Sequence, residues 1–146
     1  MKGWKMKLEE AIKIFRVFSD RTRLKIFLML LDSDLCVGEL MTVLQIEQSL
    51  ISHQLKIMRQ VGLVEGRKSG RWVFYRIPEA CRKELEPLFR NWLKDELIAG
   101  GRWIKAVKEK KVCSLSLAER RRLGQALGLE AGTAVKRRKR VKKLTD

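Results

Sequence analysis

The chain has 146 residues, 45% hydrophobic and 34% charged, enough for one domain with a modest core and an appendage. Its formal net charge of +16 is uneven, because residues 1–97 hold 18 Lys and Arg against 13 Asp and Glu, whereas residues 98–146 hold 15 against 4. Such a polycation is attracted to nucleic acid. A second, catalytic domain would not fit, and no Ser-His-Asp arrangement, phosphate-binding glycine loop or metal-ligand cluster indicates an enzyme.

The sequence also predicts where the protein works. It holds no apolar run near the roughly 20 residues that cross a bilayer, and no charged-then-apolar leader for export. We therefore expect a cytoplasmic protein without a membrane partner.

The first part of the chain is predicted to form two helices. Leu8, Ile12 and Phe15 recur at helical spacing and mark an amphipathic helix. Residues 24–31 are apolar almost all round, as in the buried centre of a small helical domain, and Asp20 stands where a helix cap would.

A helix-turn-helix is predicted next. Val37, Leu40, Met41 and Leu44 form one apolar stripe, which a second helix over residues 48–61 would cover with Ile51, Leu55 and Met58. The opposite face of that second helix carries the residue types that reach base edges and phosphates. The predicted DNA-contacting residues of this helix are Gln48, Ser49, Ser52, His53, Lys56 and Arg59. The alternative is a merely solvated polar face.

A basic hairpin is predicted to follow this helix as a two-stranded wing. Residues 63–65 and 72–77 have strand composition, and residues 66–71 between them form a glycine-containing turn. We expect Arg67, Lys68 and Arg71 to neutralise DNA phosphates there, although an ordinary exposed loop remains the alternative. The predicted fold is mainly α (α+β), a winged helix-turn-helix that would place one helix in the DNA major groove.

One long helix is predicted over residues 79–97, with an apolar face too large for so small a domain to cover. This face and that of the first helix would pair in a two-fold dimer, unless the long helix folds back on its own core. The predicted interface residues are Leu8, Ile12, Phe15, Leu85, Leu88, Phe89 and Trp92. Two recognition helices about 34 Å apart would then read an inverted repeat in double-stranded DNA.

The predicted winged-helix and dimerisation domain ends at residue 97, before a helix break at Gly100 and Gly101. Residues 98–146 form a basic extension, helical in part. Ser116 and Glu119 read as a capping box that opens a helix, and Gly128 would close it. The basic run at residues 136–143 is expected to be disordered.

Four segments resemble the ArsR/SmtB family in the order that the family has them. They are FSDRTRLKI at 18–26, DLCVGEL at 34–40, QSLISHQLK at 48–56 and GRWVFYR at 70–76, and the likeness covers about residues 8–97. The resemblance implies a homodimeric repressor that leaves its operator when a metal ion, metalloid or reactive sulfur or oxygen species alters its thiols or histidines. Where the family often has a Ser or Thr helix cap, this chain has Glu47, an acidic group that still suits a helix N-terminus.

Three cysteines are the candidate sensors: Cys36, Cys81 and Cys113. Cys36 begins a predicted helix, whose dipole lowers a thiol pKa. It falls on the first cysteine of the family's arsenic-sensing Cys-x-Cys motif, but the second position is Gly38. A three-thiolate site for arsenite or another soft metal ion would have to recruit Cys81, Cys113 or both.

Other signals remain open from the sequence. A disulfide or polysulfide between two of the cysteines would make a redox or reactive-sulfur switch, and a lone cysteine is often only a small buried apolar residue. A ligand-independent regulator is the third possibility. The sole histidine, His53, lies on the DNA-facing stripe, so the family's His-containing zinc site is not expected. Outside regulation, the competing interpretation is a basic protein that coats nucleic acid without specificity.

Overall fold

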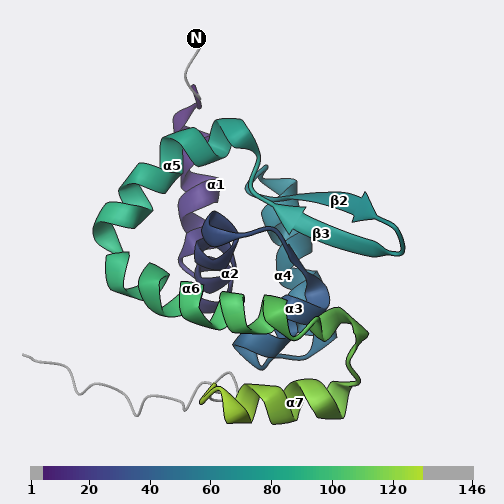
Figure 1. The fold of residues 1–146 in the computed structure, drawn as a ribbon. Helices are drawn as coiled ribbons and strands as arrows, with labels where there is room; N and C mark the ends of the chain where they lie inside the picture. The colour runs from purple at the N-terminus through teal and green to yellow at the C-terminus, as the bar shows by residue number, and fades with distance from the viewer. Residues whose placement is uncertain (1–4, 130–146) are drawn as a thin grey trace, which may run out of the picture.

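The computed structural model describes residues 5–129, and the basic run predicted to be disordered at 136–143 lies outside them. Figure 1 shows the arrangement of the described helices and strands. In chain order they are α1 (Leu8–Phe18), α2 (Arg21–Asp32), β1 (Leu35–Cys36), α3 (Val37–Leu44), α4 (Gln48–Gln60), β2 (Glu65–Ser69), β3 (Trp72–Arg76), α5 (Glu79–Trp92), α6 (Lys94–Glu109), the 3-10 turn η1 (Val112–Ser114) and α7 (Leu117–Ala126). This is the predicted winged helix-turn-helix with additional C-terminal helices.

Helix α2 is the centre of the core, as its composition predicted. Every residue from position 26 to position 31 is buried. The carboxylate of Asp20 accepts a hydrogen bond from the Arg23 backbone N–H at 3.0 Å and caps the start of the helix, which confirms that prediction. At the other end, the Arg82 guanidinium donates to the carbonyl oxygens of Leu30 and Leu31, both at 2.9 Å. Both ends of the buried helix thus have partners for their free backbone groups.

The helix-turn-helix consists of α3 and α4, packed on α2. Ile51, Leu55 and Met58 of α4 are buried, as predicted from their spacing. One polar residue joins them: Gln54 is buried and accepts a hydrogen bond from the Arg23 guanidinium at 2.9 Å. This bond fixes the rotation of α4 about its axis relative to α2.

The sheet has three strands in the described chain, in the order β1-β3-β2 and antiparallel throughout, whereas two were predicted. The prediction missed β1 because two residues are too few to show alternation. The predicted turn at 66–71 was also too long. Ladder pairing continues to Ser69 opposite Trp72, so only Gly70 and Arg71 form the loop. Gly70 has a φ of +59°, which a two-residue hairpin loop favours at its first position.

The long helix predicted over residues 79–97 is wrong, because Leu93 divides it into α5 and α6. Leu93 has φ −126° and ψ 38°, and its partly buried side chain packs against the core. The turn directs α6 back across α2, as Figure 1 shows. The predicted break at Gly100 and Gly101 is wrong too, since both lie inside α6, and residue 97 falls within this helix.

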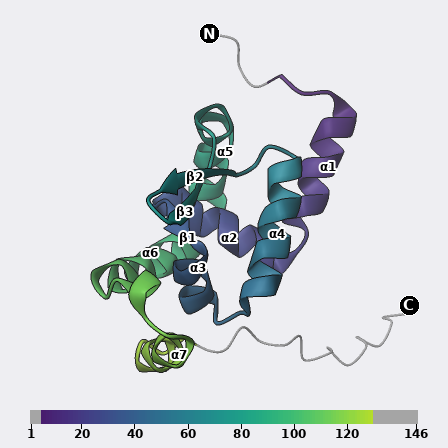
Figure 2. The same cartoon turned by 90° about the vertical axis from the view of Figure 1, so that its right-hand side faces the viewer.

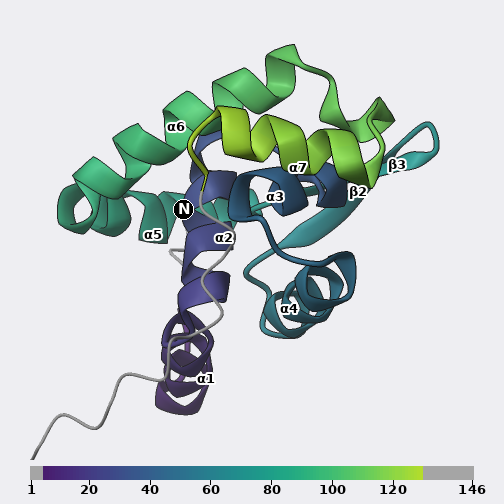
Figure 3. The same ribbon diagram turned by 90° about the horizontal axis from the view of Figure 1, so that it is seen from below.

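Helix α7 was predicted correctly at both ends. Ser116 and Glu119 form the capping box, and Gly128, with a φ of +70°, follows the helix end. Figure 3 shows α7 alongside α3, on the face of the helix-turn-helix beside α6. Within residues 5–129, no helix is both long and apolar enough to cross a membrane.

Candidate DNA-reading face and thiol pair

The outer side of α4 carries the residues predicted to contact DNA. Gln48, Ser49, Ser52, His53, Lys56 and Arg59 are all exposed. The buried Ile51, Leu55 and Met58 hold the opposite side against the core, so these polar side chains form one accessible stripe. A stripe of donors and acceptors on a rigid helix is suited to the base edges of a major groove.

The wing is the second basic element predicted to contact DNA. Figure 2 shows the hairpin of β2 and β3 on one side of α2 and helix α4 on the other. Arg67 and Lys68 are exposed on β2 rather than in a turn, and Arg71 is exposed in the loop. The Arg71 guanidinium lies 5.1 Å from the centre of the Trp72 ring, a cation–π contact that holds it at the hairpin tip. All three cations are exposed, and Arg67 and Lys68, as neighbours on a strand, lie on opposite faces of the hairpin.

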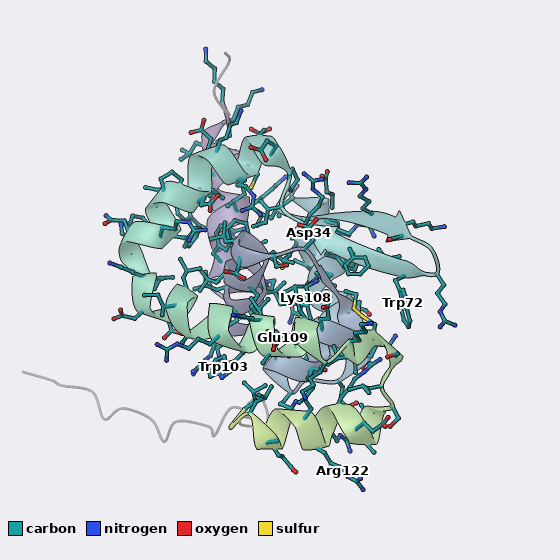
Figure 4. The ribbon with its side chains drawn as sticks, viewed as in Figure 1. Asp34, Trp72, Trp103, Lys108, Glu109 and Arg122 are labelled. Atoms are coloured by element: carbon teal, nitrogen blue, oxygen red, sulfur yellow. A yellow bond between two sulfur atoms is a disulfide. The ribbon has the colours of Figure 1, made fainter. Side chains whose placement is uncertain are left out.

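Two of the three cysteines come together. Cys36, the N-cap residue of α3, is joined by a disulfide to Cys113 in η1, with 7.4 Å between their Cα atoms. The sulfur–sulfur bond is visible in Figure 4 near the end of α6.

A carboxylate completes this cluster. The two sulfur atoms and an oxygen of Glu39 lie within 4.8 Å of one another, the only such group of potential metal ligands in the described chain. Glu39 is buried and accepts a hydrogen bond from the Cys36 backbone N–H at 3.0 Å. Its charge is balanced by Lys108, whose Nζ lies 3.1 Å from the same oxygen. Two thiolates and one carboxylate fit a soft metal or metalloid, with one thiolate fewer than arsenite prefers.

Arg120 of α7 positions the segment that supplies Cys113. Its guanidinium donates to the carbonyl oxygens of Val112 at 2.9 Å and of Cys113 at 3.2 Å. The same guanidinium lies over Gly38, where an added Cβ would come within 3.1 Å of it. Gly38 stands where the Cys-x-Cys motif of the resembled family has its second cysteine. Because glycine has no side chain, the Arg120 guanidinium has room there while it holds the Cys113 segment.

Helix α7 also reaches the start of the recognition helix. The Arg121 guanidinium lies 3.0 Å from the carboxylate of Glu47, the N-cap residue of α4. The Glu47 side chain makes no capping hydrogen bond to α4, so it serves as a contact for α7 instead. The side chain of Gln45 packs against Gly124 so closely that a Cβ would not fit there. The segment between α3 and α4 is thus covered by α7.

Cys81 stands apart from the thiol pair, which corrects its grouping with the sensor cysteines. It is buried in the core at the start of α5 and does not belong to the ligand cluster. Burial raises the pKa of the Cys81 thiol from 9.0 to about 11, more than the neighbouring Arg82 cation lowers it. A thiol that stays protonated neither attacks nor binds soft metals, so Cys81 behaves as an apolar core residue.

Sequence reasoning missed three supporting residues of this region: Glu39, Lys108 and Arg120. A capping-box spacing from Cys36 to Glu39 could have indicated the first. Lys108 and Arg120 gave no local signal, because they act on segments brought to them by the fold.

The apolar residues predicted for a dimer interface divide into three groups by exposure. Leu8, Phe15 and Trp92 are 73%, 69% and 65% exposed, and Leu88 is also exposed. Phe89 is only 8% exposed and lies against Phe18, with 5.1 Å between ring centres, so it belongs to the chain's own core. Ile12 and Leu85 are half-buried.

Comparison with known proteins identifies the family. Residues 20–66 match the family described as "Bacterial regulatory protein, arsR family". An uncharacterized HTH-type transcriptional regulator of Methanocaldococcus jannaschii is 40% identical over 80 residues, which are 54% of this chain and 90% of that protein. The chain belongs to the ArsR family. It is a DNA-binding transcriptional regulator of the ArsR type, in a family of regulators rather than enzymes.

Two further relatives of this ArsR-family chain have informative names. The arsenical resistance operon repressor of Escherichia coli is 43% identical over 67 residues, 45% of this chain and 57% of that protein. The structure of HlyU from Vibrio cholerae superposes with a TM-score of 0.53 at 34% identity, and covers 60% of this chain and 98% of its own. The likeness to HlyU confirms the winged-helix fold.

The burial of Cys81 and the pairing of the other two cysteines predict a distinct alkylation pattern. With iodoacetamide at about pH 8, the folded, non-reduced protein should gain no adduct, because only about one Cys81 thiol in a thousand is ionised. After reduction, the partly exposed Cys113 should be alkylated in the folded protein, whereas the buried Cys81 should not, as peptide mass spectrometry would show. Cys81 should react in the folded protein only as the pH nears 11.

Unfolding in urea provides the control, since the Cys81 pKa should then return to its ordinary range and all three reduced cysteines should react. Equal rates for Cys81 in the folded and unfolded chain would contradict its burial.

Proposed function

We propose that this ArsR-family protein is a sequence-specific repressor whose DNA affinity is controlled by the state of the Cys36–Cys113 pair. One observation carries this proposal: the disulfide joins Cys36, the N-cap residue of the first helix of the helix-turn-helix, to Cys113 in η1, the turn that leads into α7. A chemical change at the two thiols therefore acts directly on the DNA-binding unit.

The exposed stripe of α4 would read the operator. Ser49, Ser52, His53 and Lys56 would contact base edges in the major groove, while the wing cations Arg67, Lys68 and Arg71 contact phosphates on either side. The exposure of all these side chains supports this assignment. Since the target is operator DNA, we place the protein in the cytoplasm.

A homodimer would present two such stripes to the DNA. Phe18 of α1 contacts Phe89 of α5, which in turn contacts Trp92, so the two helices that carry the exposed apolar side chains meet at these rings. The exposed residues Leu8, Phe15, Leu88 and Trp92 of these helices are called the apolar patch. A patch of this kind is expected to be covered by a second copy. The two α4 helices would then read half-sites about 34 Å apart.

Two kinds of signal fit the thiol pair, and each has its own support. In oxidation, the two thiols lose two protons and two electrons to a peroxide, disulfide or persulfide and form the disulfide seen here. In metalloid binding, each thiol displaces a hydroxide of arsenite as water, and Glu39 would approach the third position. The name of the Escherichia coli relative favours an arsenical, whereas the disulfide favours oxidation.

Helix α7 would carry the change to the recognition helix. Arg120 ties α7 to the Cys113 segment, and Arg121 and Gln45 tie α7 to the residues just before α4. The ion pair with Glu47 is exposed, and such pairs contribute at most about 1 kcal/mol. A contact this weak can be broken and remade by a change at the thiols.

Substitutions in the α4 stripe should separate specific from non-specific binding. Ser52→Ala or His53→Ala should weaken operator binding by about 1–3 kcal/mol and leave binding to random DNA nearly unchanged, because base contacts carry the specificity. Fluorescence anisotropy at fixed salt would measure both. Lys105→Ala, an exposed cation on α6, is the matched control. An operator-to-random affinity ratio near unity for the wild type would instead indicate a nucleic-acid-coating protein.

The dimer should depend on the exposed apolar patch. Phe15→Glu or Trp92→Glu should shift the protein from dimer to monomer in sedimentation velocity, because a charge would be buried in the interface. Leu117→Glu, an exposed apolar residue on α7, should leave the dimer intact. A monomeric wild type, or dimers in every variant, would refute this interface.

The decisive experiment compares operator binding of the reduced protein with and without arsenite, and separately with an oxidant, in wild type and cysteine variants. One of the two treatments should weaken operator binding by the wild type about tenfold or more, a typical allosteric coupling. Cys36→Ser and Cys113→Ser should stay bound, whereas Cys81→Ala should behave like the wild type.

The arsenite treatment and the oxidant treatment distinguish metalloid binding from oxidation as the signal. Release by arsenite alone would make the pair a metalloid site, and release by oxidant that dithiothreitol reverses would make it a redox switch. Tight binding by the wild type under both treatments would refute control through these thiols.

A further inference from the structure

A cavity of about 520 Å³ lies between α2, α6 and the end of α7, away from both the α4 stripe and the thiol pair. Its wall is mixed, with eight apolar and four charged residues among the lining residues. The apolar ones include Leu28 and Met29 of α2, Val43 and Leu44 of α3, and Trp103 and Ile104 of α6. Figure 4 labels Trp103, which lies on α6 near the end of α7. The volume falls within the range of small-molecule sites in proteins.

The two glycines inside α6 keep this cavity open. Each costs a helix about 1 kcal/mol relative to alanine, so a pair in mid-helix needs a compensating role. Both line the cavity. A Cβ on Gly100 would meet nothing within 4 Å, which shows that the space beside it is empty, whereas a Cβ on Gly101 would lie 3.4 Å from the Asp32 carboxylate.

The polar groups of the cavity are divided between its ends. Arg21 and Lys25 lie one turn apart on the first half of α2, and neither takes part in an ion pair among the described residues. Asp32 lies at the other end of α2, roughly 10 Å further along the helix from Lys25. Glu96 is in the first turn of α6, where the helix dipole offsets its charge.

We propose that this cavity binds a small amphipathic organic anion. Its apolar body would lie over Gly100 and Gly101 against Trp103, and its acidic group would meet Arg21 and Lys25. The first half of α2 adds the positive end of its dipole, and the chain's net charge of +16 attracts anions and repels cations. The same positive potential would repel an organic cation.

The site is distinct from the thiol pair but adjoins the same helix. Gly128 and the buried Leu129, which follow α7, form part of the cavity wall. The opposite end of α7 carries Arg120 and Arg121, which contact the Cys113 segment and Glu47. A bound anion would therefore contact the residues that follow the C-terminal end of α7, away from the Cys113 segment.

Two probes with the same aromatic skeleton test the proposal on the full chain. 8-Anilinonaphthalene-1-sulfonate carries one negative charge, and N-phenyl-1-naphthylamine is its uncharged counterpart. Fluorescence titration should show saturable binding of both probes to the wild type. Gly100→Leu should weaken the binding of both probes by about tenfold or more, because the leucine side chain would fill the cavity. Since leucine has a higher helix propensity than glycine, α6 should stay folded in this variant. Ala118→Leu, on the exposed surface of α7, should bind like the wild type.

The charge assignment has its own variant. Arg21→Gln combined with Lys25→Gln should weaken the sulfonate by about tenfold, the sum of two partly exposed charge contacts, and leave the uncharged probe within about twofold. Cys36→Ser combined with Cys113→Ser should bind both probes normally, so this result does not depend on the thiol switch.

Either of two results would overturn the inference. Unchanged binding in Gly100→Leu, with thermal unfolding showing a folded protein, would place the probes elsewhere, such as the apolar patch of α1 and α5. Equal loss of both probes in the double glutamine variant would show that the two cations do not select an anion.

Discussion

The structure depends on one constraint: residues 26–31 of α2 are apolar on every side of the helix and must be covered on every side. Six consecutive residues of this helix are buried. Helices α1, α4 and α5 cover part of its surface, and the turn at Leu93 returns α6 across the remainder. Because that turn brings the C-terminal segment back to the helix-turn-helix, the disulfide, the Lys108–Glu39 pair and the α7 contacts all follow from the need to bury α2.

Gly38 leaves room for an arginine that holds the segment carrying Cys113. The arsenic-sensing Cys-x-Cys motif of the family that this chain resembles has its second cysteine at position 38, two residues after the cysteine that Cys36 matches. With glycine there, Arg120 occupies the space and holds the carbonyl oxygens of Val112 and Cys113. The sulfur that lies beside Cys36 therefore comes from η1, a segment 77 residues further along the chain. Under the proposed function, this substitution couples α7 to the signal.

Local elements were predictable, and contacts between distant segments were not. The helices of the helix-turn-helix, the Asp20 cap and both ends of α7 follow from spacing and capping residues within a few positions. Strand β1 was missed because its two residues act only by pairing with Phe74 and Tyr75. Gly100 and Gly101 predicted a break, but burial of Ile104 and Val107 outweighs a propensity cost of about 2 kcal/mol.

The sequence by itself determined the winged helix-turn-helix and which side of α4 is exposed, because helical periodicity is a local property of neighbouring residues. Only the tertiary structure decided the partner of Cys36. Cys113 lies 77 residues away, and no spacing rule relates them. Cys81 looked equivalent in the sequence, but burial raises the pKa of its thiol and removes it from the site. The chemistry of a thiol is set by what surrounds it, and those surroundings come from packing.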